Sequence, residues 1–248
     1  MIKVFKQFID NFQIHSKSYV SVVGSGGKST LIKQMAMEAS SCDWPSVITT
    51  TTHIHIPFSG QGESLLVLEK KAKVEEILPH LQNNLLVLVS RRVSDFKAKG
   101  FEPEYLEDLK EHFLLLVEAD GSKNKPFKIP ASFEPVVPKE STHIILVCSL
   151  GAIGKPLEEE YVHRIHLLEN SQKDRTITPS LVADALSKPS HYLEKFPPSS
   201  CVFVYLSGCT DPLKYSFAQQ IAHHLAQKKF LYPVFAGNIG EKTWIEKI

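Results

Sequence analysis

A glycine-rich segment that ends in Gly-Lys-Ser offers the clearest chemistry in this chain. It follows a β-branched apolar run, 21–23, and precedes a run with helical character, 30–40. Backbone N–H groups in such a turn can point at one phosphate, and the positive end of the following helix adds to the attraction. We expect Lys28 to contact the β- and γ-phosphates of a nucleotide and Ser29 to hold Mg²⁺. The residues expected to bind phosphate are Gly24, Ser25, Gly26, Gly27, Lys28, Ser29 and Thr30.

The match to the phosphate-loop pattern is incomplete. The pattern has a glycine six residues before the lysine, and this chain has Val22 there. A tight glycine turn without a ligand is therefore the alternative interpretation. The order of strand, turn and helix favours the phosphate site.

Two carboxylates come at the end of a second apolar run, 114–117. A buried carboxylate needs a partner, and a Mg²⁺ ion beside the phosphates would supply one. We expect Asp120, or Glu118 on the same strand face, to orient the metal or its water in the manner of a Walker-B residue. In this hypothesis Ser29 and Asp120 manage the metal, and Glu118 orients water or a substrate hydroxyl. An acidic helix cap after the strand is the alternative.

Four threonines and two histidines occur in a third segment, 46–56, at the end of an expected strand. If the strand continues, alternation places His53 and His55 on the same face. Two histidines without a third ligand nearby form hydrogen bonds more often than a metal site. We therefore expect Thr51, Thr52 and His53 to contact phosphate or substrate, and His53 to contribute to turnover.

Lysines are interleaved with prolines between residues 122 and 138, which indicates a rigid cationic loop. If this loop folds over the phosphates, Lys123 or Lys128 would neutralise negative charge in a transition state. Arg164 is a further candidate for the same role. A solvated run of surface charges is the alternative interpretation.

Composition restricts the class of protein. The chain has 248 residues, of which 43% are hydrophobic and 22% charged, so disordered and fibrous classes are excluded. A formal net charge of +1 gives no electrostatic case for nucleic acid as a partner. No apolar run reaches the ~18 residues of a membrane span. Four scattered cysteines without a CxxC pair favour a reducing, cytoplasmic setting.

Alternating strand and helix signals predict an α/β fold. Several apolar runs are nearly continuous in Val, Leu and Ile, as is typical of parallel strands covered by helices on both faces. We expect a doubly wound, mostly parallel sheet of the P-loop NTPase type, with ligands at the carboxyl ends of its strands. The whole chain is expected to form one domain, with room for an inserted lobe within 120–176. The predicted strands are 20–23, 46–50, 65–68, 85–89, 113–118, 144–147, 201–206 and 232–236, and the predicted helices are 2–13, 30–40, 72–83, 103–112, 178–187 and 212–229.

These motifs together resemble a known family, the YqeC-type selenium-dependent hydroxylase accessory proteins. That family carries a Gly-rich Gly-Lys-Thr-Thr loop, a Thr-Thr-Thr-His segment, and a block with Glu-Ala-Asp-Gly-x-Lys, Pro-x-Lys-x-Pro and Glu-Pro-x-x-Pro. The resemblance covers roughly residues 20–240, and its most specific part is the block at 118–138. The matching segments here are 24–30, 50–53, 118–123, 126–130 and 134–138, followed by a Gly/Leu turn at 150–157 and by His163-Arg164.

The resemblance implies a phosphate-loop protein that acts in the maturation of selenium-dependent molybdenum hydroxylases. Mg²⁺ and ATP or GTP are the expected ligands, and a molybdenum hydroxylase or its cofactor intermediate is the expected partner. Hydrolysis of the nucleotide and phosphoryl transfer to an acceptor are both open. A nucleotide-gated chaperone or scaffold without a dedicated reaction is the alternative. An Asn-Lys-x-Asp base reader would follow the strand at 201–206, but the chain has 207–211 as Ser-Gly-Cys-Thr-Asp, so guanine specificity is not supported.

Overall fold

The computed structural model describes residues 7–55, 64–69, 71, 73–168 and 176–248. Its centre is a nine-stranded sheet. Neighbouring strands in this sheet are parallel, except for the pair at one edge, β13 and β14. The strands are β1 (Tyr19–Gly24), β2 (Ser46–Thr50), β4 (Ser64–Val67), β5 (Leu85–Val89), β8 (Leu114–Glu118), β10 (His143–Ser149), β12 (Cys201–Ser207), β13 (Val234–Asn238) and β14 (Trp244–Lys247). Their order is β14-β13-β12-β10-β1-β8-β2-β5-β4.

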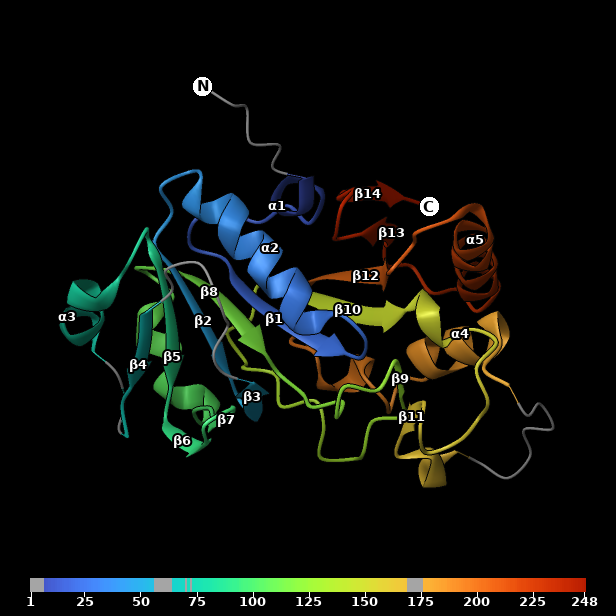
Figure 1. Ribbon diagram of the computed structural model, residues 1–248, viewed down its shortest axis with the longest axis horizontal. Coiled ribbons are helices and arrows are strands. Elements are labelled where there is room, and N and C mark those ends of the chain that lie inside the picture. Colours follow the sequence, from blue (N-terminus) through green and yellow to red (C-terminus); the bar gives the residue numbers. More distant parts are fainter. Residues whose placement is uncertain (1–6, 56–63, 70, 72, 169–175) are drawn as a thin grey trace.

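Helices cover both faces of this sheet (Figure 1). The helices α1 (Gln7–Asn11) and α2 (Lys28–Ser40) pack with one apolar cluster. The helices α4 (Pro179–Ser187) and α5 (Pro212–Gln227) pack with the other. All five residues of β8 are buried, as the continuous apolar run predicts for a strand covered on both sides. The expected mostly parallel α/β fold is confirmed, and it is consistent with the P-loop NTPase type.

Two predicted helices are wrong in extent. The segment 103–112 forms two 3₁₀ turns, Pro103–Tyr105 and Glu107–Leu109. A 3₁₀ geometry brings residues i and i+3 to the same side, and it buries Leu106 and Leu109 together. The helix expected over 72–83 is the short α3 (Val74–Ile77), followed by a 3₁₀ turn, Leu78–His80. Pro79 lacks an N–H and cannot continue an α-helix.

The N-terminal helix docks on the core as expected. Within α1 and the turn after it, Phe8, Ile9 and Phe12 are fully buried. The free N–H groups of Phe8 and Ile9 both donate to the carboxylate of Glu38 on α2, at 3.0 Å each. Ile2 and Phe5, which the prediction also assigned to this helix, lie outside the described residues.

Short strands build a lobe at the carboxyl ends of the sheet strands (Figure 1). The strands β3 (His53–His55), β6 (Arg91–Ser94) and β7 (Lys97–Lys99) form a small sheet in the order β3-β7-β6. The strands β9 (Phe127–Lys128) and β11 (Val162–His163) pair with each other in parallel. This second pair joins the block at 118–138 to the His-Arg segment. Within the described residues, no helix has the length and apolar character that crossing a membrane requires.

The aromatic contacts of α1 make it a structural element of the sheet. The ring of Phe12 lies 5.5 Å from the rings of both Phe203 and Phe235. We predict that Phe12→Ala lowers the free energy of unfolding by about 3–5 kcal/mol, measured by urea denaturation. The control is Phe96→Ala, a side chain that is 68% exposed, which should change the value by about 0.5 kcal/mol or less. Similar values for the two variants would contradict this packing role.

Candidate functional site

The phosphate-loop candidate connects β1 to α2 and packs tightly against the end of β10. Gly24, Gly26 and Gly27 have φ values of 97°, 75° and 108°, in the left-handed region that favours glycine. A Cβ on Gly24 would lie 2.1 Å from the carbonyl oxygen of Val147, and one on Gly26 would lie 2.3 Å from the Cβ of Ser149. Backbone conformation therefore favours glycine at all three positions, and close approach adds to this requirement at Gly24 and Gly26.

The departure from the phosphate-loop pattern has a structural reason. Val22 stands where the pattern has its first glycine, and it is a fully buried residue of β1. The strand extends as far as Gly24, so the turn occupies only 25–27 before α2 begins at Lys28. The loop is shorter than the pattern, but it leads into the helix in the same way.

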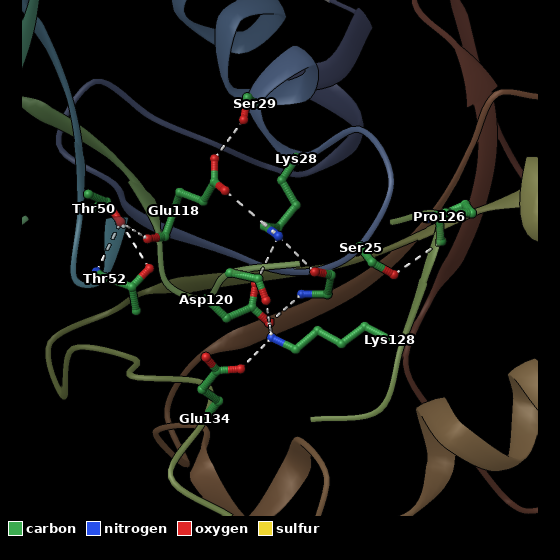
Figure 2. Close-up of polar contacts among 12 residues, drawn as sticks. Ser25, Lys28, Ser29, Thr50, Thr52, Glu118, Asp120, Pro126, Lys128 and Glu134 are labelled. Carbon is green, nitrogen blue, oxygen red and sulfur yellow. Dashed lines mark hydrogen bonds and ion pairs between the residues drawn. The ribbon is translucent and has the colours of Figure 1, made fainter. Parts of the chain in front are cut away.

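Lys28 is buried beneath the loop, as Figure 2 shows. Its amino group donates to the carbonyl of Gly24 at 2.8 Å and lies 3.1 Å from Asp120 Oδ1 and 3.7 Å from Glu118 Oε1. Burial alone would lower the pKa of Lys28, but the two carboxylates outweigh it and raise the pKa above its ordinary value. Lys28 therefore stays positively charged at the base of the loop.

Asp120 binds both the loop and a second lysine. It is fully buried, and its Oδ2 accepts from the backbone N–H of Gly24 and from Lys128 Nζ, at 2.9 Å each. Its Oδ1 forms no hydrogen bond within the described residues and is balanced by the ion pair with Lys28. Both oxygens of the Asp120 carboxylate are thus paired with groups of the protein itself.

Ser29 lies next to Glu118, not next to Asp120. The Ser29 hydroxyl donates to Glu118 Oε2 at 2.7 Å, and both residues line the same cavity. A hydroxyl and a carboxylate are ligands that Mg²⁺ accepts, together with phosphate oxygens and water. Among the described residues there is no cluster of three or more His, Cys, Asp or Glu side chains suited to a metal. The donor set fits a Mg²⁺ ion that arrives with a phosphorylated ligand, since such ions use one or two carboxylates.

Lys128 neither neutralises a ligand phosphate nor lies at the surface, the two interpretations of the cationic loop. Its side chain is fully buried, and its amino group contacts Asp120 at 2.9 Å, Glu134 at 2.6 Å and the carbonyl of Gly121 at 2.7 Å. These three contacts use all of its donors. Lys128 is thus neither a solvated surface charge nor a side chain free to reach a phosphate. Lys123, by contrast, is exposed.

Arg164 completes the network through Glu134. Its guanidinium donates to both carboxylate oxygens of Glu134, at 2.5 and 3.0 Å. Burial alone would raise the pKa of Glu134, but the hydrogen bonds and charges of Arg164 and Lys128 lower it to about 2. The guanidinium also lies 5.2 Å from the centre of the Phe133 ring. Arg164 lines the cavity, and it does so as one half of an ion pair.

A cavity of about 730 Å³ opens above the loop. Of the predicted site residues, those that line it include Lys28, Ser29, Glu118 and Thr52. Five others do not line it, namely Gly24, Ser25, Thr51, Asp120 and Lys128. The lining consists of residues 26–30, 52–54, 97, 118, 121–125, 134, 159 and 162–166.

Two of the side chains predicted to bind phosphate donate to backbone carbonyls instead. The Thr51 hydroxyl donates to the carbonyl of Val136 at 2.7 Å, and the Ser25 hydroxyl donates to the carbonyl of Pro126 at 3.2 Å. Both contacts fasten the block at 118–138 to the sheet. The backbone N–H of Ser25 is also used, since it donates to Val147.

His53 lies at the rim of the cavity and is exposed. Burial lowers the pKa of its imidazole, and the nearby charges of Lys97, Lys99 and Arg91 act in the same direction. His55 follows on the same short strand, and its side chain lies outside the described residues. A paired histidine metal site therefore stays untested.

His163 and Lys97 line the cavity, although residue patterns did not single them out as ligands. Burial lowers the pKa of His163 to about 4, and the charges of Arg164 and Lys128 add to this effect, so its imidazole is neutral near pH 7. Only the family resemblance drew attention to His163. Lys97 reaches the site through the pairing of β7 with β3, for which the sequence gives no local signal.

Asp211, the last residue of the segment 207–211 where a base reader would lie, is a helix cap. Its Oδ1 accepts from the backbone N–H of Lys214 at 3.0 Å, at the start of α5. This is the ordinary role of an aspartate before Pro at the first helical position.

Removal of the Asp120 charge should destabilise the protein strongly. Asp120→Asn leaves Lys28 and Lys128 buried without their shared carboxylate. We predict a loss of about 3–5 kcal/mol in the free energy of unfolding, measured with urea. The matched control is Asp211→Asn at the exposed helix cap, where asparagine is an equally good cap and the change should stay near zero. Equal stability of Asp120→Asn and wild type would refute the network.

Acid should weaken the fold through Glu134. A carboxylate with a lowered pKa stabilises the folded state above its unfolded pKa of about 4.5, and this contribution disappears as the pH falls toward 2. Between pH 5 and pH 3 we expect wild type to lose roughly 2 kcal/mol more than Glu134→Gln, measured by urea denaturation at each pH. Parallel losses in the two proteins would contradict the lowered pKa.

The comparisons with known proteins identify the family of this chain. The family model described as YqeC protein matches residues 20–166, which include the loop, the Thr-His segment and the 118–138 block. The curated protein named Uncharacterized protein YqeC, from Escherichia coli (strain K12), is 32% identical over 238 residues, covering 92% of this chain and 87% of its own length. No solved structure matches this chain significantly. On the family match and this identity, the chain belongs to the YqeC protein family.

Proposed function

We propose that this protein binds a nucleoside triphosphate with Mg²⁺ at the loop 24–30 and promotes a reaction of the γ-phosphate. The observation that carries the proposal is the contact between Ser29 and Glu118, 2.7 Å apart, beside a buried lysine at the start of a helix. A hydroxyl from the loop and an acid from the neighbouring strand are the pair that holds Mg²⁺ in phosphate-loop proteins.

Each residue has a distinct task in this proposal. The backbone N–H groups at the start of α2 face the phosphates, and the helix dipole favours their negative charge. Lys28 exchanges its longer contact with Glu118 for the β- and γ-phosphates and keeps its ion pair with Asp120. Glu118 and Ser29 would hold Mg²⁺, which would supply neutralisation of the phosphate charge. Asp120 acts as a positioning residue for Lys28, a different role from the metal ligand that its sequence position suggests.

The charges around the cavity are compatible with this ligand. Lys28, Lys97, Lys123, Lys125 and Arg164 line it, together with Glu118, Glu134 and Glu159. Cations therefore outnumber carboxylates, as suits a Mg-triphosphate with residual negative charge. The biological role that we propose, maturation of selenium-dependent molybdenum hydroxylases, is supported by membership of the YqeC family and not by the site geometry.

Calorimetric titration with Mg-ATP and with Mg-GTP tests the proposal directly. We expect wild type to bind at least one of them and Lys28→Ala to lose at least about tenfold in affinity, because a charged contact to phosphate is removed. Ser29→Ala is the gentler variant, since it removes a single hydroxyl. It should retain binding in EDTA and lose the gain in affinity that Mg²⁺ gives to wild type.

Lys139→Ala serves as the control, because this lysine is exposed and lies outside the cavity lining. It should bind as wild type does. Urea denaturation of each variant separates lost affinity from lost folding. Failure of folded wild type to bind either nucleotide, or unchanged affinity in Lys28→Ala and Ser29→Ala, would refute the proposed function.

A further inference from the structure

Part of the cavity extends from the phosphate loop past Glu118 and Thr52. Its lining comes from β8, the segment after β2, β7, and the loops at 121–125 and 162–166. Among the described residues, none from the carboxyl ends of β10 and β12, at 149–151 and 207–211, takes part. Figure 2 shows Glu118 and Thr52 on one side of Lys28, and Ser25 and Pro126 on the other.

In the proposed function, the γ-phosphate lies in the part of the cavity beside Glu118. In phosphate-loop proteins the metal bridges the β- and γ-oxygens, so the γ-phosphate lies beside the residues that hold the metal. If Ser29 and Glu118 hold it, as the proposed function states, the γ-phosphate enters the cavity next to Glu118. A single phosphate group fills a minor part of 730 Å³, a volume within the usual range of pockets for whole small molecules.

Two cations in this space have no partner in the part of the chain that the structure describes. Lys28 pairs with Asp120, Arg164 pairs with Glu134, and Lys125 donates to the carbonyl of Glu159. Lys97 and Lys123 line the cavity, and their amino groups form no ion pair or hydrogen bond with the described residues. They come from different segments, the hairpin of β6 and β7 and the loop after β8.

A neutral side chain lies near Lys123. His163 is 93% buried and lines the cavity together with residues 121–125. The positive charge of Lys123 is near enough to His163 to contribute to the low pKa of its imidazole. A neutral imidazole can accept or donate one hydrogen bond, which suits a polar ligand that is anchored elsewhere by its charge.

We propose that this part of the cavity binds a second ligand beside the γ-phosphate: a small molecule with a compact oxyanion, held by Lys97 and Lys123. The inference rests on the proposed function, because the nucleotide defines which part of the cavity stays open. It goes beyond that function by assigning a second binding site and the chemical class of its ligand.

Inorganic phosphate is the probe for this site. The protein is first titrated with Mg²⁺ and AMP-PNP or GMP-PNP, and then, saturated with the analogue that binds, it is titrated with phosphate by calorimetry. We expect saturable binding of one phosphate per chain. Lys97→Gln and Lys123→Gln should each weaken it about tenfold, the effect of losing one charge-assisted contact. Lys139→Gln, outside the cavity, should leave it unchanged.

The outcomes separate this inference from the proposed function. Binding of the nucleotide analogue without binding of phosphate overturns the second site and leaves the proposed function standing. Phosphate binding that is equal in wild type, Lys97→Gln and Lys123→Gln overturns it as well. A further contrary result is that Lys123→Gln lowers the affinity for the triphosphate analogue more than the affinity for the corresponding nucleoside diphosphate. Lys123 would then bind the γ-phosphate itself. Absence of nucleotide binding overturns both proposals.

Discussion

The buried carboxylate of Asp120 is the interaction on which the site depends. It accepts from the backbone of Gly24 and neutralises Lys28 and Lys128, each within about 3 Å. These contacts join the turn after β1, the start of α2 and the short strand β9, which are distant in sequence. Unpaired charges are very costly in a protein interior, so each member of this set requires the others. The phosphate loop and the lobe above it are therefore parts of one electrostatic unit.

Glu118 and Asp120 lie at the end of the same strand but differ in their surroundings. Side chains two residues apart on an extended segment point the same way, and both carboxylates do approach Lys28. They differ in depth: Asp120 is fully buried, whereas Glu118 lines the cavity and accepts from Ser29. In the proposed function the outer carboxylate meets the ligand and the inner one positions the lysine.

The lobe adds walls to the cavity above the glycine-rich loop. Pairing of β9 with β11 brings the His-Arg segment over the block at 118–138, and the ion pair of Arg164 with Glu134 fastens it there. The hairpin of β6 and β7 closes another side and contributes Lys97. The side chains of Lys97 and Lys123 line this cavity without an ion pair to the described residues, and the second ligand that we propose would bind there.

The sequence by itself determined the mostly parallel α/β sheet, because continuous apolar runs identify strands that are buried on both faces. It also located the glycine turn between β1 and α2, since Gly24, Gly26 and Gly27 are required by local backbone conformation; phosphate binding there stays a prediction. It could not determine which carboxylate lies beside Ser29, nor that Lys128 is buried, because both depend on the depth of side chains relative to distant segments. The sequence did not predict that Lys97 and His163 line the cavity, for the same reason. Their positions depend on the long-range pairing of β7 with β3 and of β11 with β9. Local chemistry fixes which residues can act, and only tertiary packing decides which of them meet.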